Sequence, residues 1–148
     1  MDRELQAMEY FMEGYNCAQA VLMAYADKIG MDAKACAKFS SSFGGGMGRM
    51  REVCGAVSGM LMVAGVLYGY DGPEEGSIKK AHYERVQYLA GKFREEAGNI
   101  ICRDILKNPP SDPAPSPRTE EYYKQRPCAR MVMVAAQLLD EFIAKNPL

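Results

Sequence analysis

The sequence predicts an all-α protein: a compact single-domain bundle of about five to seven helices, spanning residues 1–148, around a central apolar helix at about 53–70. Apolar residues recur at three- and four-residue steps, and helix-capping residues precede several of these stretches. No alternating β-branched run bounded by hairpin turns indicates a strand. A chain of this length buries a core without disulfides or a structural metal, so the cysteines are not needed for folding.

Capping and helix-breaking residues mark where the predicted helices begin and end. Asn16 followed by Gln19 is a capping-box pattern, Asp32 caps the next helix, and Pro127 suits the first position of the last one. The predicted helices lie at residues 3–12, 17–29, 33–43, 53–70, 78–97, 100–106 and 128–142.

The segment from Val53 to Tyr70 has no charged side chain over nearly the length of a membrane span. Four glycines, a serine and a cysteine dilute its hydrophobicity, and aromatic and basic anchors do not bracket both ends. We therefore predict a buried core helix and no membrane insertion. Gly55 and Gly59 are one helical turn apart, so a second helix or a cofactor can approach this face closely.

The segment NPPSDPAPSP, residues 108–117, is too rich in proline for a helix or a central strand. Too few residues follow it to build an independent core, so it is predicted to be a stiff connector or lid within one domain. Tyr122 and Tyr123 follow the segment and are candidates to cover a site or simply to pack on the surface.

Charge and leader signals exclude several classes of function. Lys and Arg number 18 against 19 Asp and Glu, a formal net charge of −1 that predicts no nucleic-acid partner. The N-terminal residues do not have the pattern of a secretory signal, which predicts a cytoplasmic protein with reduced cysteines. The glycine run at 44–48 lacks a preceding strand and a Gly-Lys-Ser/Thr signature, so a nucleotide site is not predicted.

Four of the five cysteines are predicted in the first turn of a helix, where backbone N–H groups favour a thiolate: Cys17, Cys54, Cys102 and Cys128. Arginines flank three of them and would favour ionisation further: Arg49, Arg51, Arg103, Arg126 and Arg130. Cys36 lies mid-helix without these features and is predicted to be a core residue. The only histidine, His82, is predicted on a solvated helix face and is not expected to be a ligand.

The motifs GYNCAQAV around Cys17, FGGGMGRMREVCGAVSG at 43–59, CRDIL from Cys102 and CARMVMVAA from Cys128 span nearly the whole chain. Together they resemble the C_GCAxxG_C_C family of redox-active proteins, with CGAVSG matching the CGAxxG core. The resemblance implies a redox role for these four cysteines and a frequent association with transport genes. Cys36 is outside the family pattern.

Three functional hypotheses remain open on the sequence. In the first, the four cysteines are catalytic in a thiol-based oxidoreductase that uses thiol–disulfide exchange or electron transfer with an unidentified redox partner, and Cys54 is the attacking thiol. In the second, Cys17, Cys54, Cys102 and Cys128 are ligands of a metal ion or iron–sulfur cluster. In the third, the thiols are inert and the chain is a structural or interaction domain. Small-residue helix faces are compatible with a homodimer.

Overall fold

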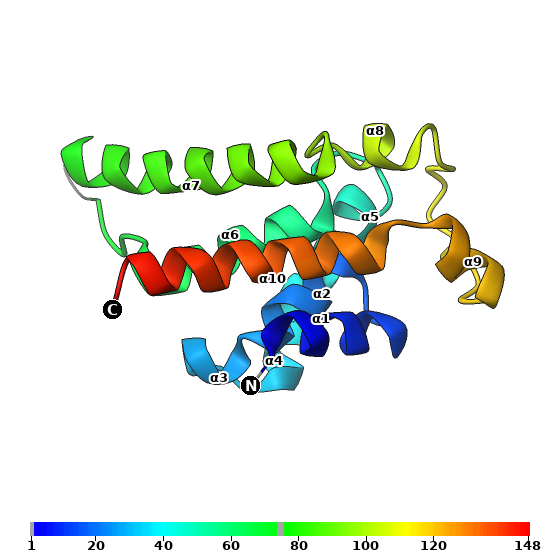
Figure 1. Ribbon diagram of the computed structural model, residues 1–148, viewed down its shortest axis with the longest axis horizontal. Helices are drawn as coiled ribbons and strands as arrows, with labels where there is room; N and C mark the ends of the chain where they lie inside the picture. The colour runs from blue at the N-terminus through cyan, green and yellow to red at the C-terminus, as the bar shows by residue number, and fades with distance from the viewer. Residues whose placement is uncertain (1, 74–75) are drawn as a thin grey trace.

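The computed structural model describes residues 2–73 and 76–148 and confirms the all-α class (Figure 1). In the described ranges, β pairing is limited to an isolated bridge between Val53 and Ile101. The elements in chain order are α1 (Arg3–Met12), α2 (Cys17–Ala24), α3 (Ala26–Ile29), α4 (Ala33–Ser40), the 3-10 turn η1 (Ser41–Phe43), α5 (Gly44–Met47), α6 (Gly55–Tyr68), α7 (Gly76–Ala97), α8 (Cys102–Leu106), α9 (Glu120–Gln125) and α10 (Cys128–Lys145).

The described residues form nine regular helices, which exceeds the predicted range of five to seven. The predicted helix at 17–29 is divided at Tyr25 into α2 and α3, and α9 forms in a stretch where no helix was predicted. The one α segment left out of this count, α5, is not a regular right-handed helix, because Gly45 and Gly46 have positive φ angles of 65° and 70°. The difference in helix number therefore comes from short segments, because sequence patterns do not resolve where such segments begin and end.

Side-chain caps begin the N-terminal helices as predicted. The Asn16 side chain accepts a hydrogen bond from the Gln19 backbone N–H at 2.9 Å, and the Asn16 N–H donates to the Gln19 side chain at 3.0 Å. This confirms the capping box at the start of α2. Asp32 caps α4 by accepting hydrogen bonds from two backbone N–H groups.

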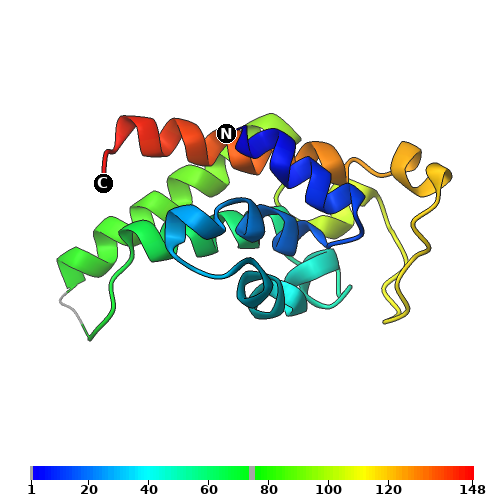
Figure 2. The same cartoon turned by 90° about the horizontal axis from the view of Figure 1, so that it is seen from below.

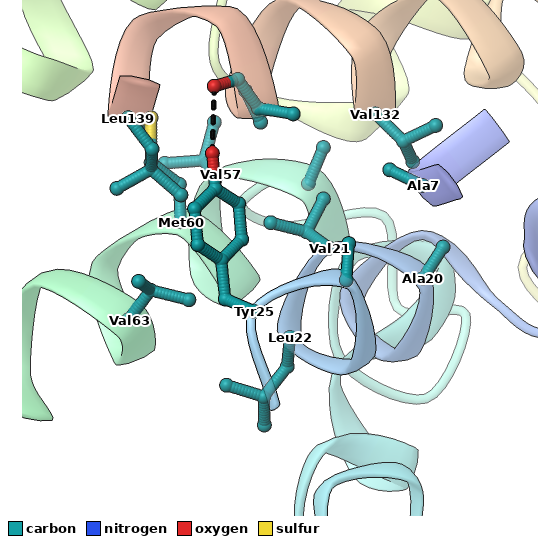
Figure 3. Packing of buried hydrophobic residues seen from close by; sticks show 14 of the residues in the cluster. Ala7, Ala20, Val21, Leu22, Tyr25, Val57, Met60, Val63, Val132 and Leu139 are labelled. Atoms are coloured by element: carbon teal, nitrogen blue, oxygen red, sulfur yellow. Dashed lines mark hydrogen bonds between the residues drawn. The ribbon is translucent and has the colours of Figure 1, made fainter. Parts of the chain in front are cut away.

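The core lies where α1, α2, α6 and α10 pack on one another, with α7 covering α6 and α10 (Figure 2). Tyr25 is fully buried among aliphatic side chains that include Val57 and Met60 (Figure 3). Its hydroxyl lies 2.9 Å from the Ala136 carbonyl oxygen and 2.6 Å from the Asp140 carboxylate. Burial and the Asp140 hydrogen bond raise the pKa of Tyr25, which keeps the phenol neutral and ties α2 to α10.

The central apolar segment forms α6, a buried core helix as predicted. Gly55 and Gly59 face α2: a Cβ on Gly59 would lie 2.8 Å from the Ala18 carbonyl oxygen, and one on Gly55 would lie 3.1 Å from the Cys17 Cβ. These glycines therefore let two helices pack closely. No described helix is both long enough and apolar enough to span a bilayer.

The prediction that His82 is solvent-exposed is wrong. Only 8% of the residue is exposed, because the chain before α7 folds back and places the Tyr70 ring 6.1 Å from the imidazole. Burial lowers the pKa of His82, and the nearby Arg85 guanidinium lowers it further. His82 is thus a neutral packing residue at neutral pH, remote from the cysteines described next.

The proline-rich segment at 108–117 has no regular structure and connects α8 to α9 along one end of the bundle (Figure 2). Arginines from the loop after α5 hold it in place. Arg49 Nε donates to the Asp112 carbonyl at 2.8 Å, and Arg51 Nε donates to the Pro110 carbonyl at 2.9 Å. The segment therefore lies over the end of the bundle where α2, α6, α8 and α10 begin (Figure 1).

Candidate functional site

The four predicted site cysteines all lie at helix N-termini and line one cavity of about 420 Å³. Cys17, Cys102 and Cys128 are the first residues of α2, α8 and α10, and Cys54 is the N-cap of α6. Their helices come from distant parts of the chain, so only the tertiary structure brings the thiols to one place. Cys36 is buried in α4 and does not line the cavity.

α5 and the loop that follows it form one wall of the cavity. Gly46 has a φ angle of 70°, and a Cβ there would lie 2.6 Å from the Glu52 nitrogen and 2.8 Å from the Cys102 Cβ. Only glycine fits this approach. Met47, Arg49 and Arg51 also have positive φ angles, so the loop is a strained turn that the surrounding contacts hold in place.

Backbone hydrogen bonds join this loop to the start of α8. The Cys54 N–H donates to the Ile100 carbonyl at 2.7 Å, and the Cys102 N–H donates to the Glu52 carbonyl at 2.6 Å. These bonds flank the Val53–Ile101 bridge, so two extended segments pair for a few residues. This short pairing, which has no helical periodicity, positions Cys54 beside Cys102 on the cavity wall.

Cys17 and Cys128 lie close enough for each thiol to affect the pKa of the other. The hydrogen bond from Cys17 lowers the pKa of Cys128, and Arg126, Arg118 and Arg51 lower it further, against the opposing effect of burial. The same hydrogen bond, together with burial, raises the pKa of Cys17 well above its usual value. Of the two thiols, Cys128 is therefore the one that ionises more easily, and Cys17 is the one that keeps its proton.

At the other two cysteines, which include Cys54, the predicted attacking thiol, burial opposes ionisation. Burial raises the pKa of Cys54 to about 12, although the backbone N–H groups of Ala56 and Val57 at the helix start act to lower it. Burial also raises the pKa of Cys102, against a 3.6 Å contact from Arg51 Nη1. Desolvation thus outweighs the helix terminus at both positions.

Four arginines line the cavity: Arg49, Arg51, Arg118 and Arg126. The other two arginines that flank cysteines in the sequence point elsewhere. Arg103 pairs with Glu52 at 2.9 Å, and Arg130 donates to the Glu96 carbonyl at 3.2 Å. Arg118 was missed by sequence reasoning because it is ten residues from the nearest cysteine, and no motif marks it.

Arg118 and Arg126 stack on the aromatic residues at the cavity rim. The Arg118 guanidinium lies 4.4 Å from the Phe11 ring centroid and 5.0 Å from that of Tyr122, and it donates to the carbonyls of Phe11 and Tyr15. Arg126 lies 4.9 Å from the Tyr122 ring centroid. Tyr122 thus lines the cavity and holds two cations beside it.

The donor geometry does not match the metal hypothesis. Among the described residues, no three His, Cys, Asp or Glu side chains are arranged to hold a metal ion. The thiols instead contact each other and a guanidinium: Cys17 hydrogen-bonds Cys128, and Arg51 hydrogen-bonds Cys102. Cationic groups beside the sulfurs suit anionic thiolates more than a shared cation. All five cysteines are free thiols in this structure.

The helical fold and this cavity define an all-α protein with a four-cysteine site. A family model described as "Putative redox-active protein (C_GCAxxG_C_C)" matches residues 15–142. The chain therefore belongs to this family, as its motifs predicted. No curated protein and no solved structure gives a significant match to the chain.

Proposed function

We propose that this protein is a dithiol oxidoreductase in which Cys17 and Cys128 form the active pair. The observation that carries the proposal is that both cysteines begin a helix at one cavity, where each thiol affects the pKa of the other and the arginines favour the Cys128 thiolate. A thiolate beside a second thiol is the arrangement that disulfide exchange requires, because one sulfur attacks and the other resolves.

The proposed reaction has two exchange steps. The Cys128 thiolate attacks one sulfur of a disulfide substrate, the substrate S–S bond breaks, and the departing thiolate takes up a proton. Cys17 then loses its proton and attacks the Cys128 sulfur, which releases the second substrate thiol and leaves a Cys17–Cys128 disulfide. The protein gives two electrons to the substrate, and a thiol reductant of the cell restores the dithiol.

Cys54 and Cys102 belong to the proposed site because both line the same cavity. Their raised pKa values make them poor initial nucleophiles at neutral pH. We place them in later exchange with the Cys17–Cys128 disulfide, toward the redox partner. Free thiols throughout the chain suit a reducing compartment, so we also propose a cytoplasmic location.

Disulfide mapping tests the proposal. Reduced protein is mixed with hydroxyethyl disulfide, quenched with acid, digested and analysed by mass spectrometry. We expect a Cys17–Cys128 cross-link in the wild type and a stable mixed disulfide at Cys128 in the Cys17→Ser variant. The Cys128→Ser variant should lose the initial reaction.

The matched control is Cys36→Ser, which removes a thiol outside the cavity and should leave the cross-link unchanged. A first mixed disulfide at Cys54, or a wild-type protein that forms no disulfide, would contradict the assignment of the pair.

A further inference from the structure

The cavity around the cysteines carries an excess of positive charge. Arg49, Arg51, Arg118 and Arg126 line it, and none of its described lining residues is Asp or Glu. The charge of Arg49 is compensated, because its guanidinium lies 3.9 Å from the Asp112 carboxylate within the proline-rich segment. The other three form no ion pair within the described part of the chain; their partners are carbonyls, two hydroxyls, a thiol and aromatic rings.

Among these cations, Arg51 is buried with an unsatisfied hydrogen-bond donor. Only 4% of the residue is exposed, and its Nη2 atom is buried without a hydrogen-bond partner. A buried guanidinium with an unused donor is costly unless an anion or acceptor completes its shell. Cys102 does not supply that charge, since burial raises the pKa of its thiol. We therefore expect the Arg51 Nη2 donor to bind an anionic or acceptor group of a ligand in the cavity.

The charge count sets the kind of ligand. Three guanidinium groups, those of Arg51, Arg118 and Arg126, line the cavity, and none of its described lining residues is a carboxylate. Subtracting one charge for an ionised Cys128 from these three still leaves an excess of about two positive charges. Electric fields inside a cleft of one sign concentrate ligands of the opposite sign.

The size of the cavity argues for an organic molecule. A volume of about 420 Å³ falls within the range of about 300–1,000 Å³ that small organic ligands occupy, and a bare inorganic oxyanion would fill little of it. Phe11, Ile105, Leu106 and Met131 supply apolar wall beside the polar groups. A ligand with a short carbon skeleton and acidic ends fits both surfaces.

We infer that the substrate is a small organic disulfide bearing carboxylates, bound with its acidic groups at Arg51 and Arg126 and its sulfur at Cys128. This inference rests on the proposed thiol–disulfide exchange and adds the class of its substrate. A carboxylate takes up the unused Nη2 donor of Arg51 in a charge-assisted hydrogen bond. The products are two molecules of the corresponding acidic thiol, and the electrons come from the Cys17–Cys128 dithiol.

A charge series of disulfide reagents tests the inference. Dithiodipropionate is a dianion, hydroxyethyl disulfide is neutral and cystamine is a dication, while all three are short and flexible. The rate of Cys17–Cys128 formation is measured for each and divided by its rate with free mercaptoethanol, which removes differences in intrinsic reactivity. We expect the dianion to react at least about tenfold faster than the neutral reagent, and the dication slowest.

Variants assign the preference to the arginines. Arg126→Gln and Arg51→Met should each bring the normalised dianion rate closer to that of the neutral reagent. Arg94→Gln, an exposed position on α7, is the matched control and should retain the full preference. If Arg51→Met does not fold, Arg126→Gln alone still decides, because its side chain contacts only a hydroxyl and a ring at the rim.

A binding measurement separates this inference from the proposed function. Calorimetric titration of Cys128→Ser with dithiodipropionate and with cystamine reports charge selectivity without exchange, and we expect binding of the dianion alone. Equal normalised rates, or binding that favours the dication, would overturn the inference and leave the exchange reaction standing. Dianion binding without any disulfide formation in the wild type would overturn the proposed function while keeping the anionic ligand.

Discussion

Cys17 and Cys128 are each the first residue of a helix, yet their thiol pKa values move in opposite directions. One proton is shared across their hydrogen bond, so stabilising the Cys128 thiolate keeps Cys17 protonated. The helix N-terminus is common to both and does not distinguish them. Neighbouring side chains do, because Arg126 and Arg118 lie on the Cys128 side.

The pH dependence of thiol alkylation tests this difference at the scale of single residues. As the pH is raised from about 6, iodoacetamide should label Cys128 first, because its pKa is lowered, and Cys54 well after it, because burial raises its pKa to about 12. Mass spectrometry of quenched samples gives a rate for each cysteine. Labelling of Cys54 ahead of Cys128 at neutral pH would refute the assignment.

Replacing Cys17 tests whether this residue lowers the pKa of Cys128. Cys17→Ala deletes the hydrogen bond to the Cys128 thiolate, which is worth about 1.5–3 kcal/mol for a charged acceptor. The Cys128 labelling midpoint should therefore move up by roughly one to two pH units. An unchanged midpoint would mean that the arginines alone set the pKa.

Close packing of two helices holds the cavity together at the scale of elements. α6 contacts α2 through Gly55 and Gly59, and this contact brings Cys54 and Cys17 to the same end of the bundle. α5 adds a second constraint, because its Gly46 lets the chain approach Cys102 closely. Small residues thus determine where the thiols meet, although none of them reacts.

Gly59→Ala tests the packing. The added Cβ would lie 2.8 Å from the Ala18 carbonyl oxygen and 3.0 Å from the Val21 Cβ, so the helices must separate. We expect a loss of about 1–3 kcal/mol in the free energy of unfolding, measured by urea denaturation.

Gly65→Ala on the same helix is the control, because a Cβ there meets no atom within 4 Å. It should stabilise the protein by about 0.5–1 kcal/mol through lower backbone entropy in the unfolded chain. Equal effects of the two substitutions would show that α6 does not pack on α2 as described.

At the scale of the whole molecule, oxidation of the proposed pair would join α2 to α10 across more than a hundred residues of sequence. A cross-link over so long a loop restricts the unfolded chain strongly. The oxidised protein should therefore be more stable than the reduced protein by about 2–4 kcal/mol. Thermal unfolding with and without reductant measures the difference, and a lower melting temperature after oxidation would mean that the bond strains the bundle.

Metal chelation tests the whole molecule in another way. Because no three His, Cys, Asp or Glu side chains in the described residues form a ligand group, the melting temperature should be the same with and without a strong chelator. Elemental analysis of anaerobically purified protein is the companion measurement. Stoichiometric iron, with a charge-transfer band lost in Cys54→Ser, would favour the cluster hypothesis over thiol exchange.

Much of the helical architecture was predictable, because caps and periodicity are local. The helix at 3–12, the capping box at Asn16 and the buried helix after Cys54 follow from residues within a turn or two of each other. The positions of the four cysteines at helix starts follow for the same reason. His82 was mispredicted because its cover, Tyr70, comes from outside its own helix.

The sequence by itself determined the all-α class, the family and the four cysteines of the candidate site. Only the tertiary structure distinguishes the environments of the thiols, because burial, the neighbouring Cys17 and the Arg118 charge act on Cys128 through space. The same holds for the unsatisfied Arg51 and the cavity around it. Helix propensity acts over a few neighbouring residues, whereas desolvation and Coulomb forces depend on which distant segments the fold brings together.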